Sequence, residues 1–334
     1  MKKVSVILIA VAAVAAFLFI IFDIIRPEPS ACSFFAMNTY ISAEIEGKDS
    51  DSASSEITDI INNLDKNVLS RTSESSVIFK LNQTGCADLD ENTEDYFLQL
   101  ADVSKQSGGS FDFTLGAISD LWKFSSTPSI PDAATLSDAL SHTGYGKVVL
   151  TENKVSLSDR SAVVDFGASG KGIALDEVKK CLNSKEIDRA VVSVGGSILL
   201  YGDGKFTVGV KNPVAGSDGF AMTLKIPAGC VSTSGNYEQF FEHNGKIYHH
   251  ILDPKTGYPV NNGIVSATVI SESGILSDAL STACFALGIE EGYELAEKFG
   301  ATVIFITDDN VIHVKNGTDI DYEYDETAFT QVTD

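Results

Sequence analysis

The chain has 334 residues, with 46 acidic and 24 basic side chains and a formal net charge of −22 at neutral pH. This charge argues against a nucleic-acid partner, because such partners favour a strongly basic face. A negatively charged ligand would need local help, from a metal ion or from backbone N–H groups.

The N-terminal segment, residues 1–26, places two lysines before about 20 mostly apolar residues, enough to cross a bilayer. The positive end favours the cytoplasm, so we expect the rest of the chain at the cell membrane on its extracytoplasmic side. The apolar run is longer than that of an ordinary signal peptide, which favours an uncleaved anchor. The alternative is a lipoprotein with lipidation at Cys32. Residues 27–36 are predicted to be a short linker.

The rest of the chain mixes helix and strand patterns without a regular β–α–β rhythm, which predicts an α+β fold. In chain order we expect an amphipathic helix over 54–68, a helix over 93–107, a hairpin over 148–157, paired strands over 190–202 and 205–210, a strand over 266–271, a helix from Ser277 to about Phe299, a hairpin over 301–314, and a poorly ordered acidic tail from Asn316.

Residues 232–260 combine paired histidines with a turn. His249 and His250 end the strand-like run GKIYHH, and Asp253–Gly257 has the Asp, Pro and Gly of a rigid turn. A strand that delivers an imidazole to such a turn is a common way to hold a general base. The alternative is a polar hairpin at the surface.

The run SDALST places Asp278, Ser281 and Thr282 at i, i+3 and i+4 of a predicted helix. A carboxylate with hydroxyls on one helix face suits a hard cation such as Mg²⁺. Ordinary capping of a first turn is the alternative.

Two further segments suggest a binding site. VVDFGASGKG passes from Asp165 through small residues to Lys171 at a helix start, which suits a phosphate or is simply a tight connection. SGGSFDFT brings Phe111 and Asp112 after a glycine pair, which suits a flat ring or a core cluster of aromatics. Met37, in MNT, could likewise face a ring or the core.

The order of these motifs carries more information than any one of them. MNT, SVIFKLN, SFDFT, DFGASGKG, VGGSI, STSGNY, HHILDPKTGYP and DALST together resemble the ApbE family of FAD:protein FMN transferases, over about residues 34–307. The resemblance implies one large T-fold-like domain of mixed, mainly antiparallel sheets with helices, which we place at residues 37–315. Residues 316–334 are then the acidic tail.

The resemblance also implies an activity. A Thr or Ser hydroxyl of a membrane or secreted redox protein attacks the FMN phosphorus of FAD in a Mg²⁺-dependent reaction, and AMP leaves. Two alternatives stay open: a Mg²⁺-dependent FAD pyrophosphatase that gives FMN and AMP, and a flavin-binding protein without turnover.

By position, the resemblance assigns His250 as the catalytic base. The implied metal ligands are Asp278 and Thr282 with adjacent Ser281 and the backbone carbonyl of Ala168. The implied FAD contacts are Met37, Ser110, Phe111, Asp112, Asp165, Lys171 and the backbone of Leu252.

Three positions depart from the family's pattern. Asn38 replaces a glycine, Ser110 replaces an alanine, and Thr72 stands where many members place an aromatic that packs on the flavin. The loss of that aromatic at Thr72 could admit water to the site, which keeps the pyrophosphatase alternative open.

Overall fold

The computed structural model describes residues 29–124, 126–214, 217, 219–315 and 320–333. The predicted anchor, residues 1–26, lies outside them. Within the described residues, no helix is both long enough and apolar enough to cross a membrane.

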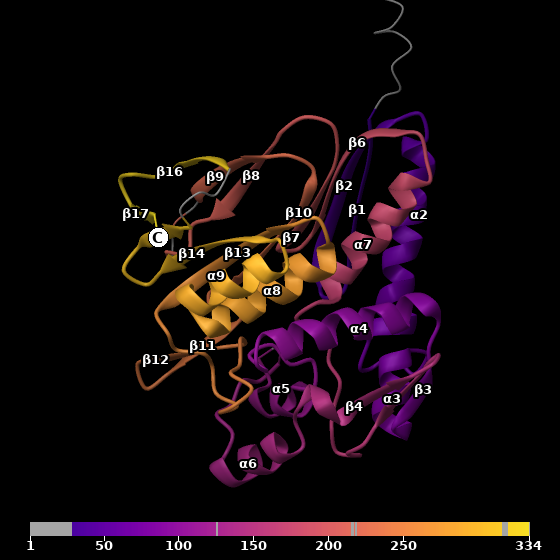
Figure 1. Ribbon diagram of the computed structural model, residues 1–334, viewed down its shortest axis with the longest axis vertical. Helices are drawn as coiled ribbons and strands as arrows, with labels where there is room; N and C mark the ends of the chain where they lie inside the picture. Colours follow the sequence, from indigo (N-terminus) through magenta and orange to yellow (C-terminus); the bar gives the residue numbers. More distant parts are fainter. Residues whose placement is uncertain (1–28, 125, 215–216, 218, 316–319, 334) are drawn as a thin grey trace, which may run out of the picture.

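Helices and strands are interspersed along the chain (Figure 1). The helices are α2 (Ser50–Asn63), α3 (Val77–Thr84), α4 (Glu91–Gln106), α5 (Gly116–Trp122), α6 (Ala133–Ser141), α7 (Gly170–Asn183), α8 (Gly274–Leu287) and α9 (Ile289–Lys298), with a π-helix η1 (Leu64–Leu69) and a 3₁₀ turn η2 (Tyr145–Lys147). The strands are β1 (Ser30–Ala36), β2 (Thr39–Gly47), β3 (Cys86–Asp88), β4 (Val148–Thr151), β5 (Lys154–Leu157), β6 (Ile187–Val194), β7 (Ser197–Gly202), β8 (Phe206–Lys211), β9 (Phe220–Ile226), β10 (Gly229–Gly235), β11 (Phe240–His243), β12 (Lys246–His249), β13 (Ile264–Ser271), β14 (Thr302–Thr307), β15 (Val311–Val314), β16 (Asp321–Tyr324) and β17 (Thr330–Thr333).

The largest sheet in the described part of the chain has nine strands in the order β1-β2-β6-β7-β10-β13-β14-β15-β17. Its pairs are antiparallel except β15 with β17. Helices α2, α7, α8 and α9 pack on one face, where the alternating buried residues of β2 (Ile41, Ala43 and Ile45) meet them. The prediction of a single α+β domain with mainly antiparallel sheets is therefore confirmed.

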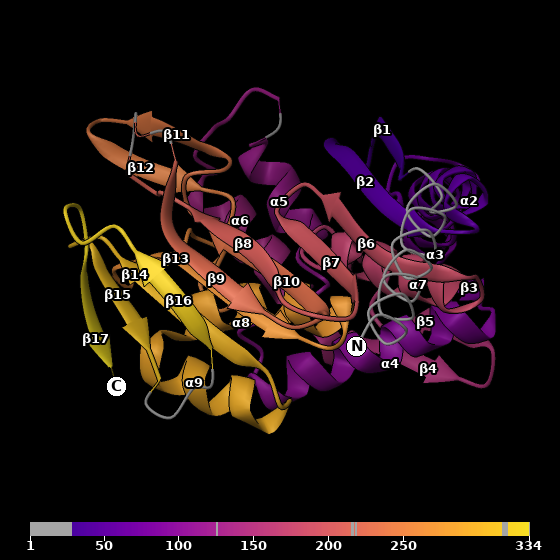
Figure 2. The ribbon, with the colours of Figure 1, turned by 90° about the horizontal axis from the view of Figure 1, so that it is seen from above.

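A second, smaller core lies on the other face of this sheet. The three-stranded sheet β16-β9-β8 covers that face over β10 and β14, as the view in Figure 2 lets the reader follow. Met222 and Leu224 of β9 bury their side chains there against Ile304 and Ile306 of β14. Both faces of this half of the sheet are therefore apolar.

Helices α7 and α8 cross in very close contact because each has a glycine at the crossing point, Gly172 on α7 and Gly274 on α8. A Cβ on Gly172 would stand 2.2 Å from the carbonyl oxygen of Gly274, and one on Gly274 would stand 2.4 Å from that of Gly172. This contact brings the start of α7, with Lys171, beside Asp278 of α8.

The predictions for two segments near the ends of the chain were wrong. The predicted linker, residues 27–36, is wrong over Ser30–Ala36, because these residues pair with β2 and pack Cys32 and Phe34 against the core. The tail beyond Asn316 is not poorly ordered over residues 320–333. There β16 pairs with β9, β17 pairs with β15, and Phe329 is buried in the second core.

Two predicted boundaries also need correction. Residues 190–202 form two strands, because Gly195 turns the chain with a φ of 59°. The strand after them, β8, pairs with β9 instead of with its predecessor. Ser277 is not a helix N-cap: Ser273 holds that position, with its Oγ accepting from Leu276 N, and the helix stops at Leu287.

Candidate functional site

The turns of two hairpins and the start of α7 meet at one end of the large sheet. Met37 lies in the β1–β2 turn, donates its N–H to Asp65 (3.0 Å), and places its Cε 3.3 Å from where a Cβ on Gly170 would be. Gly195, in the β6–β7 turn, stands against Thr39. This arrangement brings Met37 to the N-terminus of α7, where Lys171 begins.

The departure at Asn38 has a conformational explanation. Met37 and Asn38 have φ values of 52° and 56°, in the left-handed region. Glycine adopts this region freely, and Asn tolerates it better than most other residues. Asn38 therefore preserves the turn without the usual glycine.

Asp278 is the centre of the polar contacts at this end of the sheet. Its Oδ2 accepts from the backbone N of Gly172 (2.9 Å), and its Oδ1 accepts from Ser197 Oγ (3.2 Å). Lys171 Nζ lies 3.4 Å from the same Oδ1. A buried carboxylate needs such partners, and here they come from α7 and β7.

The hydroxyls of the same helix face have partners on β10. Ser234 Oγ lies 2.8 Å from Ser281 Oγ and 3.1 Å from Thr282 Oγ1. Ser281 is buried and also donates to the carbonyl of Asp278 (2.8 Å), whereas Thr282 is partly exposed. Ser197 and Ser234 were not predicted as site residues, although both lie inside quoted motifs (VGGSI and STSGNY).

The donor set suits a hard divalent cation. Asp278, Ser281 and Thr282 offer oxygens on one face of α8, and the ammonium of Lys171 already neutralises the carboxylate as a cation would. Nowhere in the described residues do three or more His, Cys, Asp or Glu side chains gather in a metal-binding group. The other ligands of a cation here would therefore be hydroxyl, carbonyl or substrate oxygens.

His250 lies just beyond the end of β12, with part of its side chain open to solvent. Its Nδ1 is 3.3 Å from the carbonyl oxygen of Gln239, which also accepts from the His250 backbone N. A carbonyl only accepts, so Nδ1 carries the proton and Nε2 keeps a free lone pair. The accessible imidazole can therefore take up a proton at Nε2.

The pKa of His250 is lowered from its ordinary value. The first cause is the loss of solvation on the side covered by protein, and the positive charge of nearby Lys171 adds to it. The hydrogen bond to Gln239 acts in the opposite direction. His250 is consequently neutral at physiological pH and able to act as a base.

His249 has a structural setting instead. It is buried, packs edge-on against Phe285 of α8, and lies with Nε2 2.9 Å from the carbonyl of Val260. Burial lowers its pKa, so it stays neutral and donates from Nε2. The contact closes the loop that begins at His250.

The predicted turn at Asp253–Gly257 is confirmed. The carbonyl of Asp253 accepts from Gly257 N (2.7 Å), its carboxylate accepts from Lys255 N (2.9 Å), and Gly257 has a φ of 70°. Leu252 buries its side chain with Trp122 in a small separate core, so only its backbone could face a ligand.

Asp165 belongs to a network that the sequence did not reveal. Arg71 Nε lies 3.1 Å from Asp165 Oδ2, and the same guanidinium makes two 3.1 Å contacts with Asp120. Thr72, beside Arg71, is exposed, and its Oγ1 lies 3.2 Å from Ser70 Oγ. Arg71 thus joins the loop that carries Thr72 to the loop at Asp165 before α7.

Asp112 holds a loop by its own hydrogen bonds. Its Oδ1 accepts from Thr114 and its Oδ2 from Tyr145 N (2.8 Å), and burial raises its pKa. Phe111 is buried in the main core, so its side chain packs on protein, while Ser110 is partly exposed. The backbone bond from Asp165 N to Phe113 O (2.8 Å) joins this segment to the Asp165 network.

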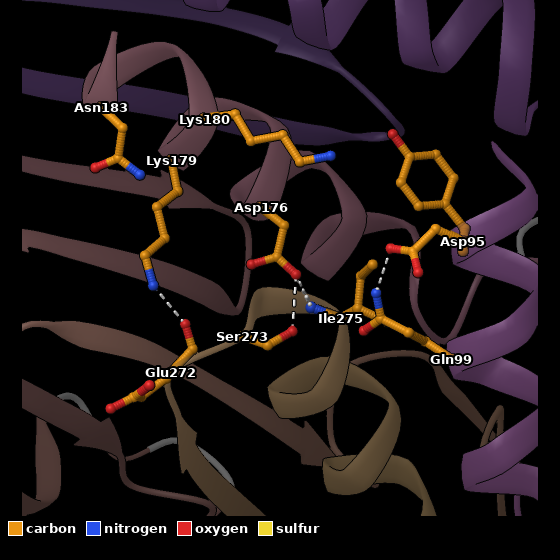
Figure 3. A pocket seen from close by; sticks show the side chains of 10 residues that line it. Asp95, Gln99, Asp176, Lys179, Lys180, Asn183, Glu272, Ser273 and Ile275 are labelled. Atoms are coloured by element: carbon orange, nitrogen blue, oxygen red, sulfur yellow. Dashed lines mark hydrogen bonds between the residues drawn. The ribbon is translucent and has the colours of Figure 1, made fainter. Parts of the chain in front are cut away.

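A pocket of about 390 Å³ lies elsewhere, between α4, α7 and the loop before α8 (Figure 3). None of the predicted site residues lines it. Asp176 already occupies the N-terminus of α8 there, accepting from Ser273 Oγ (2.8 Å), Gly274 N (2.6 Å) and Ile275 N (3.0 Å). The pocket is therefore separate from the group around Asp278.

Fold and site together define an α+β domain with the Lys171–Asp278 pair at one end of the large sheet and an accessible histidine, His250. A sequence profile of the ApbE family matches residues 37–305, so the chain belongs to the ApbE family, as its ordered motifs indicated.

Curated relatives carry the name FAD:protein FMN transferase. The one from Treponema pallidum is 32% identical over 274 residues, covering 75% of this chain and 76% of that protein. One from Klebsiella pneumoniae is 35% identical over 202 residues, covering 59% of this chain and 63% of that protein. The crystal structure of the ApbE protein from Thermotoga maritima matches with a TM-score of 0.76 at 28% identity, covering 90% of this chain and 98% of that one.

Proposed function

We propose that this protein is a Mg²⁺-dependent FAD:protein FMN transferase. The hydroxyl oxygen of an acceptor Thr or Ser attacks the FMN phosphorus of FAD, and the bond from that phosphorus to the bridging diphosphate oxygen breaks. The acceptor keeps FMN as a phosphoester, and AMP leaves. The observation that carries the proposal is the neutral, accessible His250 within electrostatic reach of Lys171, which itself contacts Asp278.

His250 would serve as the base. Its Nε2 accepts the proton of the acceptor hydroxyl while Nδ1 stays hydrogen-bonded to Gln239. The hydrogen bond between His249 and Val260, which closes the loop that begins at His250, would help to hold the imidazole in position. The proton then passes to the leaving phosphate or to solvent.

A Mg²⁺ ion would be held by Asp278, Thr282 and Ser281, with the carbonyl of Ala168, at the oxygen-rich face of α8. When bound, it neutralises the diphosphate and stabilises the leaving phosphate. Lys171 and the N-terminus of α7 offer further positive charge to the phosphates.

FAD itself would lie along the segments that meet at this sheet end. Met37, which is held in the β1–β2 turn, and Asp165, which is paired with Arg71, would contact FAD there. Ser110, Thr72 and the backbone of Leu252 complete the proposed contacts, while Phe111 and Asp112 support them from within the fold.

We further propose that the enzyme is anchored in the cell membrane by residues 1–26 and faces outward, with lipidation at Cys32 as the alternative. The acceptor is then a membrane or secreted redox protein. This placement rests on the sequence of the N-terminal segment.

One experiment separates the proposal from its alternatives. The protein is incubated with FAD, Mg²⁺ and a candidate acceptor, and the products are measured by mass spectrometry and chromatography. A covalent gain of FMN on the acceptor supports transfer. Free FMN with AMP and no adduct supports the pyrophosphatase, which the exposed Thr72 favours. Unchanged FAD in every condition argues against both enzymes.

A further inference from the structure

Lys171 contacts the same oxygen atom, Asp278 Oδ1, that the candidate cation site would use. Asp278 Oδ2 is bonded to a fixed backbone donor, Gly172 N at 2.9 Å. Oδ1 instead faces the rotatable hydroxyl of Ser197 and the flexible ammonium of Lys171, at 3.2 and 3.4 Å. Oδ1 is therefore the oxygen whose partners can be exchanged.

Lys171 is also the more exposed partner of this pair. The side chain of Lys171 is 29% exposed, whereas that of Asp278 is 5% exposed. A divalent cation held by Asp278 Oδ1 would compete with the ammonium of Lys171 for this oxygen. The repulsion between such a cation and an ammonium on the same oxygen is large in a partly buried site.

We propose that Lys171 is an exchangeable counter-ion of Asp278: cation binding at Oδ1 displaces its ammonium, which then pairs with the diphosphate of the substrate. The inference rests on the metal site in the proposed function. Lys171 has a flexible stem at the very start of α7, so it can turn away without disturbing the helix.

Two effects on binding follow from this exchange. Without FAD, Lys171 competes with Mg²⁺, so its removal tightens Mg²⁺ binding. With FAD, the displaced ammonium gains a new partner, so Lys171 strengthens the coupling between Mg²⁺ and FAD. A lysine that only bound phosphate would leave the affinity for Mg²⁺ alone unchanged.

The test is calorimetric titration of the full chain with MgCl₂, with and without FAD, for wild type and four variants. We expect K171M to bind Mg²⁺ about tenfold more tightly than wild type without FAD, as loss of a competing ion pair of this kind predicts. We also expect FAD to raise Mg²⁺ affinity less in K171M than in wild type. K171R keeps the positive charge and should behave as wild type.

Two controls separate failure of this inference from failure of the proposed metal site. K180M removes a lysine from the same helix whose partners are Glu177 and Asn92, so it changes the net charge equally and should leave Mg²⁺ affinity unaltered. D278N should lose Mg²⁺ binding. If D278N binds like wild type, the metal site is wrong. If D278N weakens binding but K171M does not tighten it, or if neither wild type nor K171M binds Mg²⁺, the exchange is refuted.

Discussion

At the scale of single residues, two adjacent histidines have opposite settings. His249 is buried and bonded to Val260, whereas His250 is open to solvent with a free Nε2. We expect His250→Ala to lower the FMN transfer rate at least about 100-fold, because a positioned base contributes that much or more. FAD affinity should change little. Single-turnover rates and FAD titration measure the two effects, with exposed His243→Ala as the matched control.

The pH dependence follows from the same residue. Loss of solvation, with help from Lys171, lowers the pKa of His250 to about 4 from an ordinary 6.5. Its solvent contact limits this depression, so we expect an apparent pKa between these two values. A base works only when unprotonated, so kcat/KM should stay level from pH 8 to 6.5 and fall below that. Removing the charge in Lys171→Met should move the fall to higher pH. A rate that falls already above pH 7 would assign the base elsewhere.

At the scale of helices and strands, local sequence patterns predicted the elements themselves but not which strands pair with one another. The hairpin over 148–157 and the helix over 93–107 were predicted correctly, since turn and periodicity signals lie within each. The predicted partner of strand β8 was the strand before it, whereas β8 pairs with β9, which follows it in the chain. The N-cap at Ser273 was missed because Ser277 carries the same signal one turn later.

The residues of the candidate site also fall into two groups, those that the sequence predicted and those that it did not. Ordered motifs predicted His250, Asp278 and Lys171 as site residues, and the structure brings Lys171 and Asp278 together. Ser234 and Arg71 were missed, since each matters through a side chain distant in sequence. Such contacts depend on how β10 packs under α8 and how the loop at Arg71 meets Asp165, which no local pattern encodes.

The crossing of α7 and α8 gives a prediction at this scale. Gly172→Ala would bring a methyl group within 2.2 Å of the Gly274 carbonyl oxygen, so the helices must separate. We expect a loss of unfolding free energy of about 2 kcal/mol or more. Gly146→Ala is the control, since nothing lies within 4 Å of its Cβ position. Equal denaturation midpoints for both variants would contradict the close crossing.

At the scale of the whole molecule, the two hydrophobic cores lie on opposite faces of the large sheet and support different parts of the protein. The main core holds the helices that carry the candidate site, while the second core backs the far half of the sheet with β8, β9 and β16. The C-terminal strands belong to this second core, so the domain extends beyond the predicted boundary at residue 315.

The final prediction tests whether those last strands support the fold. Phe329 is 3% exposed in the second core, whereas Val332 on β17 is 43% exposed. We expect Phe329→Ala to cost about 3 kcal/mol of unfolding free energy, as for other buried aromatics, and Val332→Ala less than about 0.5 kcal/mol. Urea denaturation measures both. Because Phe329 lies in the core across the sheet from α8, the folded Phe329→Ala protein should retain wild-type Mg²⁺ affinity. If Phe329→Ala is as stable as Val332→Ala, the segment after residue 319 does not support the second core.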